Sequence, residues 1–213
     1  MKRTNITIAK ILAVLLLAVL SLNTAGAAVL KKGVSKAAPL TQAYVWYDGD
    51  RERQVWLDPQ VVAEFKPGPQ GESSIRSAYA AATVMHTKRR QGAVRLWKLN
   101  DTAATTVIRS LKTIHPQGKY SAVLHDGPSG AGRMRALPGN IIVYLDPQWD
   151  KTAVSNWLGS HKLEIVKKLE IGPNIYVIKT GPGLEALDTA NMLYRSGEVK
   201  AAFPDWWQEV VTR

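Results

Sequence analysis

The histidines are the side chains of this sequence best suited to acid–base chemistry or metal binding. There are four, none in an H-x-H or H-E-x-x-H arrangement: His86, His115, His125 and His161. His125 precedes Asp126 and lies close to Ser129, so the residue types of a hydrolytic triad occur together. A triad needs convergence in space rather than proximity in sequence, and GPSGAG around Ser129 lacks the G-x-S-x-G turn. We therefore predict no catalytic residue.

Metal and cofactor chemistry has little support in the residue pattern. The chain has no cysteine, which excludes disulfides, cysteine-ligated zinc and iron–sulfur clusters. Four carboxylates in the second half of the chain are better explained as helix caps or surface charges than as an acid–base pair: Asp146, Asp150, Glu164 and Glu170. PGPQGE (67–72) has too few glycines and no Lys-Ser/Thr for a phosphate loop. We predict no metal and no cofactor.

The excess of positive charge suggests nucleic acid, but its location argues against that partner. The net charge is +11, from 28 basic and 17 acidic residues. Residues 58–127 carry +5 (10 basic minus 5 acidic), whereas residues 128–213 carry only +1 (10 minus 9). The basic run Lys88-Arg89-Arg90 is typical of a charged hairpin tip, or it steers an acidic partner, a cell-wall polymer or an anionic membrane surface. No aromatic RNA-binding signature is present, and we predict no nucleic-acid partner.

The N-terminus has the three parts of a secretory leader. Lys2, Arg3 and Lys10 precede an apolar run over 11–22, and Ala25-Gly26-Ala27 offers a cleavage site. The apolar run is short for a membrane span, although an uncleaved anchor is the alternative. We expect residues 1–27 to be a signal peptide, the protein to be exported to the periplasm or the medium, and no membrane anchor to remain after cleavage.

Behind a flexible arm (28–43), apolar patterns indicate a hairpin and an internal repeat. Aromatic and β-branched runs on either side of Asp48-Gly49 predict a β-hairpin over 44–57. VVAEFKP (61–67) and IIVYLDP (141–147) then each begin a series of strand, amphipathic helix, two strands, second helix and last strand.

This order predicts an α+β protein of two tandem ferredoxin-like (βαββαβ) units with antiparallel sheets, preceded by the hairpin. The units span 58–127 and 140–213, and the Gly/Pro-rich segment 128–139 is predicted to link them. With both helices on one face of each sheet, the other face is expected to be free for a partner.

Three segments carry a family resemblance: VWYDGDRERQVWLDPQVVAEF (45–65), NIIVYLDPQWDKTAVSNWL (140–158) and VKAAFPDWWQEV (199–210). In this order they resemble the propeptides of subtilisin-like serine proteases, in particular the prodomain of fervidolysin-type bacterial subtilases, over residues 44–210. The D-[ST]-G, H-G-[TH] and G-T-S segments of the catalytic domain are not found. The resemblance therefore implies a free-standing, non-enzymatic propeptide-like protein that inhibits a subtilisin-like protease or assists its folding.

Such propeptides place a C-terminal tail in the protease cleft, and the matching tail here is Asp205–Arg213. We expect the contacts to come from Trp206, Trp207, Gln208, Val210, Val211 and Arg213. Neighbouring strand residues face opposite ways, so one tryptophan can instead cap the core. Two other readings stay open: an extracellular binding module that uses free sheet faces and the basic first unit, and a truncated remnant of a subtilase.

Overall fold

The computed structural model describes residues 40–66, 73–85, 93–130 and 132–209, all within the compact unit Ala37–Arg213. The predicted signal peptide, most of the predicted arm, His86 and the basic run Lys88-Arg89-Arg90 lie outside these residues. Within the described part, no helix combines the length and apolar character that a membrane crossing requires.

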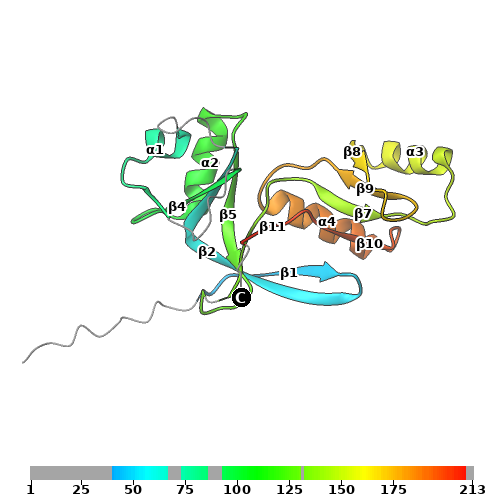
Figure 1. Cartoon of the computed structure of the whole chain (residues 1–213), viewed down its shortest axis with the longest axis horizontal. Coiled ribbons are helices and arrows are strands. Elements are labelled where there is room, and N and C mark those ends of the chain that lie inside the picture. Colours follow the sequence, from blue (N-terminus) through cyan, green and yellow to red (C-terminus); the bar gives the residue numbers. More distant parts are fainter. Residues whose placement is uncertain (1–39, 67–72, 86–92, 131, 210–213) are drawn as a thin grey trace, which may run out of the picture. The chain divides into compact units, whose positions relative to one another are not determined.

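The described residues form an α+β fold with antiparallel strands, as predicted (Figure 1). The elements up to the middle of the chain are β1 (Ala43–Asp48), β2 (Arg51–Phe65), α1 (Ser74–Ala78), β3 (Thr83–Val84), β4 (Val94–Lys98), α2 (Ala104–Ile114), β5 (Lys119–His125) and β6 (Met134–Ala136). The later elements are β7 (Ile141–Tyr144), α3 (Lys151–Ser160), β8 (Ile165–Lys168), β9 (Ile175–Ile178), α4 (Leu184–Ser196), β10 (Ala201–Pro204) and β11 (Trp207–Gln208).

The element order β-α-β-β-α-β occurs twice, from β2 to β5 and from β7 to β10; we call these the first and second repeat. The strand order is β5-β2-β4-β3 within a seven-stranded sheet and β10-β7-β9-β8 in a four-stranded sheet. Corresponding strands of the two repeats thus occupy corresponding positions. The first helix differs, because α1 ends at Ala78 when Tyr79 leaves the helical conformation (φ −137°, ψ 84°).

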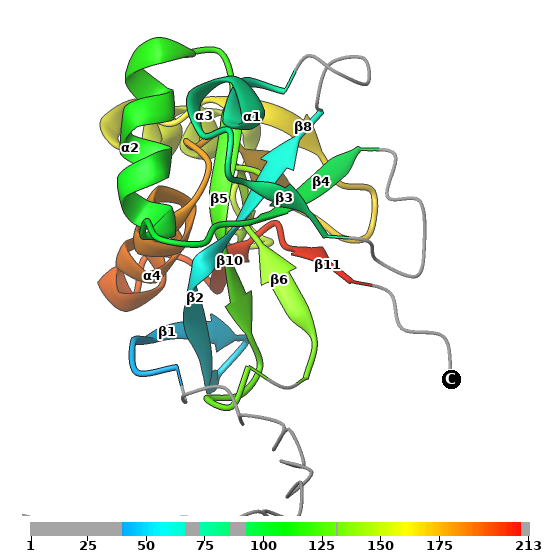
Figure 2. The ribbon, with the colours of Figure 1, turned by 90° about the vertical axis from the view of Figure 1, so that its left-hand side faces the viewer.

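Two features of the seven-stranded sheet were not predicted. β2 pairs with β1 from Trp56 to Arg51 and continues as the first strand of the first repeat, so the hairpin and that repeat share one strand. The segment 128–139, expected to be a linker, contains β6, which pairs with β5 and β11 (Figure 2). Strand formation there depends on partners on both sides, which local Gly/Pro content does not reveal.

The core consists of several separate clusters, because neighbouring residues of a strand point to opposite faces of its sheet. α1 and α2 pack on one face of the seven-stranded sheet around Val62, Trp97 and Leu111, while Val61, Ala63 and Leu96 lie on the opposite face. α3 and α4 cover the four-stranded sheet around Val143 and Leu193.

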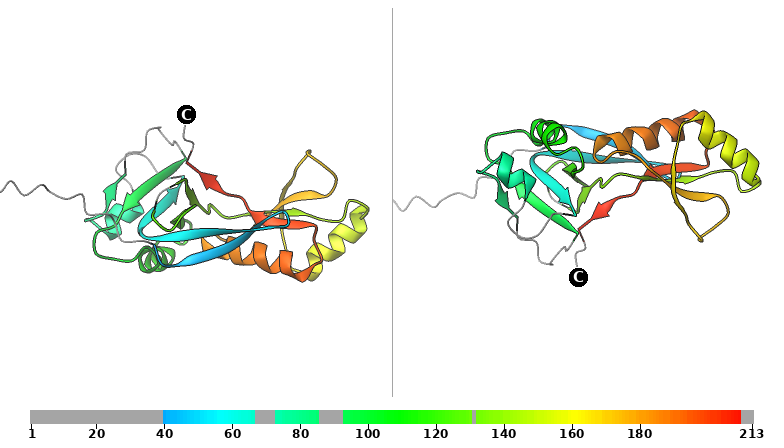
Figure 3. Two further views of the ribbon diagram at one scale, coloured as in Figure 1. Left: turned by 90° about the horizontal axis from the view of Figure 1, so that it is seen from below. Right: turned by 90° about the horizontal axis from the view of Figure 1, so that it is seen from above.

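A fourth cluster joins the two repeats. It consists of Trp46, Val55, Leu124, Leu137 and Leu187, contributed by β1, β2, β5, the β6–β7 connection and α4. The hairpin lies beside α4, where Asn191 Nδ2 donates to the backbone carbonyl of Val45 at 2.8 Å (Figure 3). The repeats therefore share buried apolar surface.

A buried carboxylate organises the first repeat. Glu64 on β2 accepts hydrogen bonds from Ser73 Oγ and from Trp97 Nε1, both at 2.9 Å. Ser73 is also the N-cap of α1, and Ser74 Oγ contacts both Glu64 and the Tyr120 hydroxyl. The carboxylate thereby ties the first turn of α1 to strands β2 and β4.

Candidate functional site

The tail is bound to its own chain as far as Glu209. β11 pairs antiparallel with β6, Trp207 opposite Ala136 and Gln208 opposite Arg135. Arg133 Nη1 donates to Gln208 Oε1 at 2.8 Å, and the backbone N–H of Glu209 donates to the carbonyl of Met134 at 3.0 Å. The tail is thus an edge strand of the seven-stranded sheet (Figure 2).

The two tail tryptophans face opposite directions, as strand alternation predicts, and both are half-buried. Trp207 packs against the cluster of Val61, Ala63 and Leu96. Trp206 packs at the cluster that joins the repeats, and its ring meets that of Trp46 edge to face, with centroids 5.5 Å apart. Both side chains therefore contribute to the fold.

Arg135 on β6 connects the tail to the hairpin. Its guanidinium lies 5.4 Å from the Trp46 ring and 5.6 Å from the Trp206 ring, within the range of cation–π attraction. Its Nε donates to Asp126 Oδ1 at 2.5 Å. The sequence offered no signal for this role, because Arg135 falls in the predicted linker.

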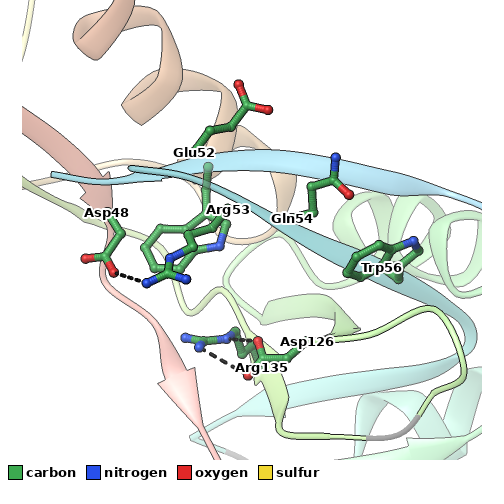
Figure 4. A pocket seen from close by; sticks show the side chains of 8 residues that line it. Asp48, Glu52, Arg53, Gln54, Trp56, Asp126 and Arg135 are labelled. Carbon is green, nitrogen blue, oxygen red and sulfur yellow. Dashed lines mark hydrogen bonds and ion pairs between the residues drawn. The ribbon is translucent and has the colours of Figure 1, made fainter. Parts of the chain in front are cut away.

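A groove of about 560 Å³ lies beside Trp46 and Arg135 (Figure 4). It is lined by Trp46, Asp48, Glu52, Arg53, Gln54, Trp56, Asp126 and Arg135. Both arginines are paired with carboxylates, Arg53 with Asp48 at 3.6 Å and Arg135 with Asp126. The lining holds no hydroxyl nucleophile and no imidazole, so the groove offers aromatic and charged contacts for binding.

The sequence neighbours His125, Asp126 and Ser129 do not form a triad. His125 is buried, and its Nε2 lies 3.3 Å from Oδ2 of Asp58, whereas Asp126 is held by Arg135. Burial acts to raise the pKa of Asp58, but hydrogen bonds from His125 and the Gln60 N–H, together with the charge of Lys98, bring that pKa below its usual value. The His125–Asp58 pair joins β5 to β2 at the point where the register between these two strands shifts.

A second serine–histidine–carboxylate set, not singled out by sequence, lies at the end of α3. Ser160 Oγ is 3.1 Å from His161 Nδ1, and His161 Nε2 is 3.2 Å from Glu198 Oε2. However, Ser160 Oγ donates to the carbonyl of Trp157, and Nδ1 lies 2.9 Å from the same carbonyl. Because a carbonyl only accepts, a hydrogen bond from Nδ1 to it requires a proton on Nδ1, and a protonated Nδ1 cannot serve as the base for Ser160. This set links α3 to the α4–β10 connection.

Metal binding has no visible site in the described ranges, where no three of His, Asp and Glu gather closely enough to hold an ion. The remaining predicted contact residues, Val210, Val211 and Arg213, lie outside the described residues.

Asp205, where the tail begins, provides a test of the tail's environment. Burial raises the pKa of its half-buried carboxyl, and the charge of Lys167 offsets this only in part. A carboxyl with a raised folded-state pKa stabilises the fold below its unfolded pKa of about 3.9, and this contribution is lost as pH rises through the folded pKa. Asp205→Asn should therefore increase the free energy of unfolding at pH 7, with the gain vanishing near pH 3.

Urea unfolding at the two pH values measures this difference, with Glu170→Gln, an exposed carboxylate, as the matched control. A lower stability of Asp205→Asn at pH 7 would contradict the assignment.

Comparison of the chain with protein-family models, with curated proteins and with solved structures finds no match.

Proposed function

We propose that this protein is an exported, non-enzymatic partner of a subtilisin-like serine protease, acting as its inhibitor or folding assistant in the manner of a propeptide. The two repeats are proposed to be tandem ferredoxin-like units. The observation that carries the proposal is the docking of the tail on β6, which holds the chain up to Glu209 at the edge of the seven-stranded sheet.

The outer face of the four-stranded sheet supports a protein partner. Strand pairing places Ile142, Tyr144, Val177 and Phe203 opposite to the side that packs against α3 and α4. Tyr144 and Phe203 are half-buried, and their rings lie 5.8 Å apart. Val177 is buried and Phe203 also packs against the cluster that joins the repeats, so Tyr144 is the aromatic side chain that this face offers most openly. Half-buried aromatic side chains on a rigid sheet are typical of interface centres.

The docked geometry divides the predicted tail residues into two groups. Trp206, Trp207 and Gln208 are engaged by the protein itself and anchor the tail. We assign contact with the enzyme to Val210, Val211 and Arg213, since β-branched residues suit strand addition to an edge of the cleft.

A truncation after Glu209 tests this assignment. The intact protein should inhibit a subtilisin-like protease, and the truncated protein should lose affinity by about tenfold or more, because each tenfold corresponds to about 1.4 kcal/mol of lost contacts. The melting temperature should be unchanged, since the β6–β11 ladder is retained. The measurement is the inhibition constant against a panel of purified subtilases.

Gln208→Ala in the intact chain is the comparison variant. It removes the hydrogen bond from Arg133 that anchors the tail, but it keeps residues 210–213. Equal inhibition by the intact and truncated proteins would reject the tail model. Failure of the intact protein both to inhibit and to assist refolding would reject the protease partner.

A second candidate function is binding of an extracellular polymer in the groove. The partly exposed Trp56 next to Arg53 and Glu52 is the observation that favours it. Retention on a polysaccharide column that is lost in Trp56→Ala, without protease inhibition, would support this candidate instead.

A further inference from the structure

The outer strand of the second repeat has an unoccupied edge. β8 pairs with β9 and ends the strand order β10-β7-β9-β8, so on its other side no strand of the described chain pairs with it. All four of its residues, Ile165 to Lys168, are exposed. Such an edge presents backbone N–H and C=O groups that another extended chain can pair with.

This edge also concentrates exposed apolar side chains. Ile165 is 40% exposed, Val166 is 50% exposed, and Ile171 in the following turn is 72% exposed. The other large exposed hydrophobic residues of the described chain, Val84, Ile114 and Met192, lie singly on β3, α2 and α4. Scattered exposed apolar residues are ordinary, whereas a group along an edge strand marks an interaction surface.

The charge of the edge indicates what kind of chain fits it. Lys167 and Lys168 form no ion pair within 4.0 Å in the described structure, and the neighbouring Glu164 is already paired with Lys179 at 2.7 Å. Glu170 is the one acidic residue between 165 and 171, which leaves a net charge of +1 (2 basic minus 1 acidic). Lys168 is thus without an ion-pair partner in the described structure, and Lys167 has only the more distant charge of Asp205 near it.

A second copy of this chain fits the edge poorly. In a symmetric antiparallel pair of two β8 strands, Lys167 of one copy would be a diagonal neighbour of Lys168 of the other. Like charges at such positions destabilise a strand pair, and edge lysines are a common device against self-association.

We propose that β8 binds, by strand addition, an extended segment of another protein in which acidic side chains alternate with apolar ones. The backbone groups of β8 provide the affinity, and Ile165 and Val166 offer apolar contacts. Lys167 and Lys168 face opposite sides of the sheet, so one of them meets the acidic face of the added strand. The backbone of β8 does not pair with the tail, so failure of protease inhibition would leave this proposal standing.

The probe is a synthetic peptide of four Val-Glu repeats, compared with four Val-Lys repeats, titrated into isotope-labelled protein. The Val-Glu peptide should shift the amide resonances of β8 and β9 and slow hydrogen exchange in β8, and the Val-Lys peptide should bind about tenfold or more weakly. Lys167→Glu/Lys168→Glu should reverse this preference. Lys112→Glu/Lys151→Glu, with the same change in net charge at exposed positions elsewhere, should keep it.

Several outcomes would overturn the proposal. Equal affinity for both peptides removes the charge argument, and amide shifts at another edge place the binding elsewhere. No binding at millimolar peptide, or a concentration-dependent dimer formed through β8, excludes an acidic strand as the occupant. Circular dichroism of each variant establishes that the fold is retained, so a loss of binding reports on the edge itself.

Discussion

Replacing Glu64 by alanine is expected to lower the free energy of unfolding by about 3–5 kcal/mol. The residue is 4% exposed, and its carboxylate accepts hydrogen bonds from Ser73 and Trp97, with Arg95 at 3.9 Å. Truncation would leave these buried donors without an acceptor and a partly buried guanidinium without its counter-charge. Each orphaned donor costs about 1–3 kcal/mol, so the loss exceeds that of an apolar truncation of similar size.

Urea unfolding followed by far-UV circular dichroism measures this loss. Glu64→Gln keeps an oxygen acceptor and should cost less than Glu64→Ala, whereas Glu170→Ala on the surface should stay within about 0.5 kcal/mol of the parent protein. A change for Glu64→Ala no larger than that of Glu170→Ala would show that the carboxylate is not needed to fix α1.

Local sequence patterns predicted the elements that form through their own periodicity. VVAEF (61–65) and IIVY (141–144) lie in the equivalent strands β2 and β7, and a helix follows each of them. The sequence could not predict which strands pair with each other. β6 forms a strand only between β5 and β11, and these two strands are far apart in the chain. For the same reason, no local sequence pattern indicated that β2 continues through Leu57 and Asp58.

The side-chain clusters were harder to predict than the elements. His125 and Asp126 are adjacent in sequence, yet one is buried against Asp58 and the other pairs with Arg135. Glu64 has no unusual neighbours in sequence, and its partners Ser73 and Trp97 come from separate elements. Spacing along one segment cannot encode such convergence, which arises only when the strands pair.

The tail illustrates how tertiary packing changes the meaning of a residue. Two adjacent tryptophans suggested anchors for a partner, and the structure uses both within its own core clusters. The guanidinium of Arg135, which contacts the rings of both Trp46 and Trp206, makes the tail's position depend on the hairpin. A change in the hairpin should therefore affect the proposed inhibition through the tail.

Leu187→Ala is expected to destabilise the protein by about 2.7–5 kcal/mol and to loosen both repeats together. Its side chain is 0% exposed on α4 and packs with Trp46, Val55 and Leu124, which belong to the hairpin and the first repeat. Because this cluster is shared, a cavity there weakens the contact between the repeats as well as the second repeat itself. Leu193→Ala is the matched control, since Leu193 is equally buried on the same helix but packs within the second repeat.

Native-state hydrogen exchange separates these two effects. In Leu187→Ala, exchange should accelerate in the β1–β2 hairpin as well as in α4. In Leu193→Ala it should accelerate in the second repeat while the hairpin stays closer to the parent protein. If the hairpin amides respond alike to both substitutions, or to neither, the shared cluster does not couple the repeats.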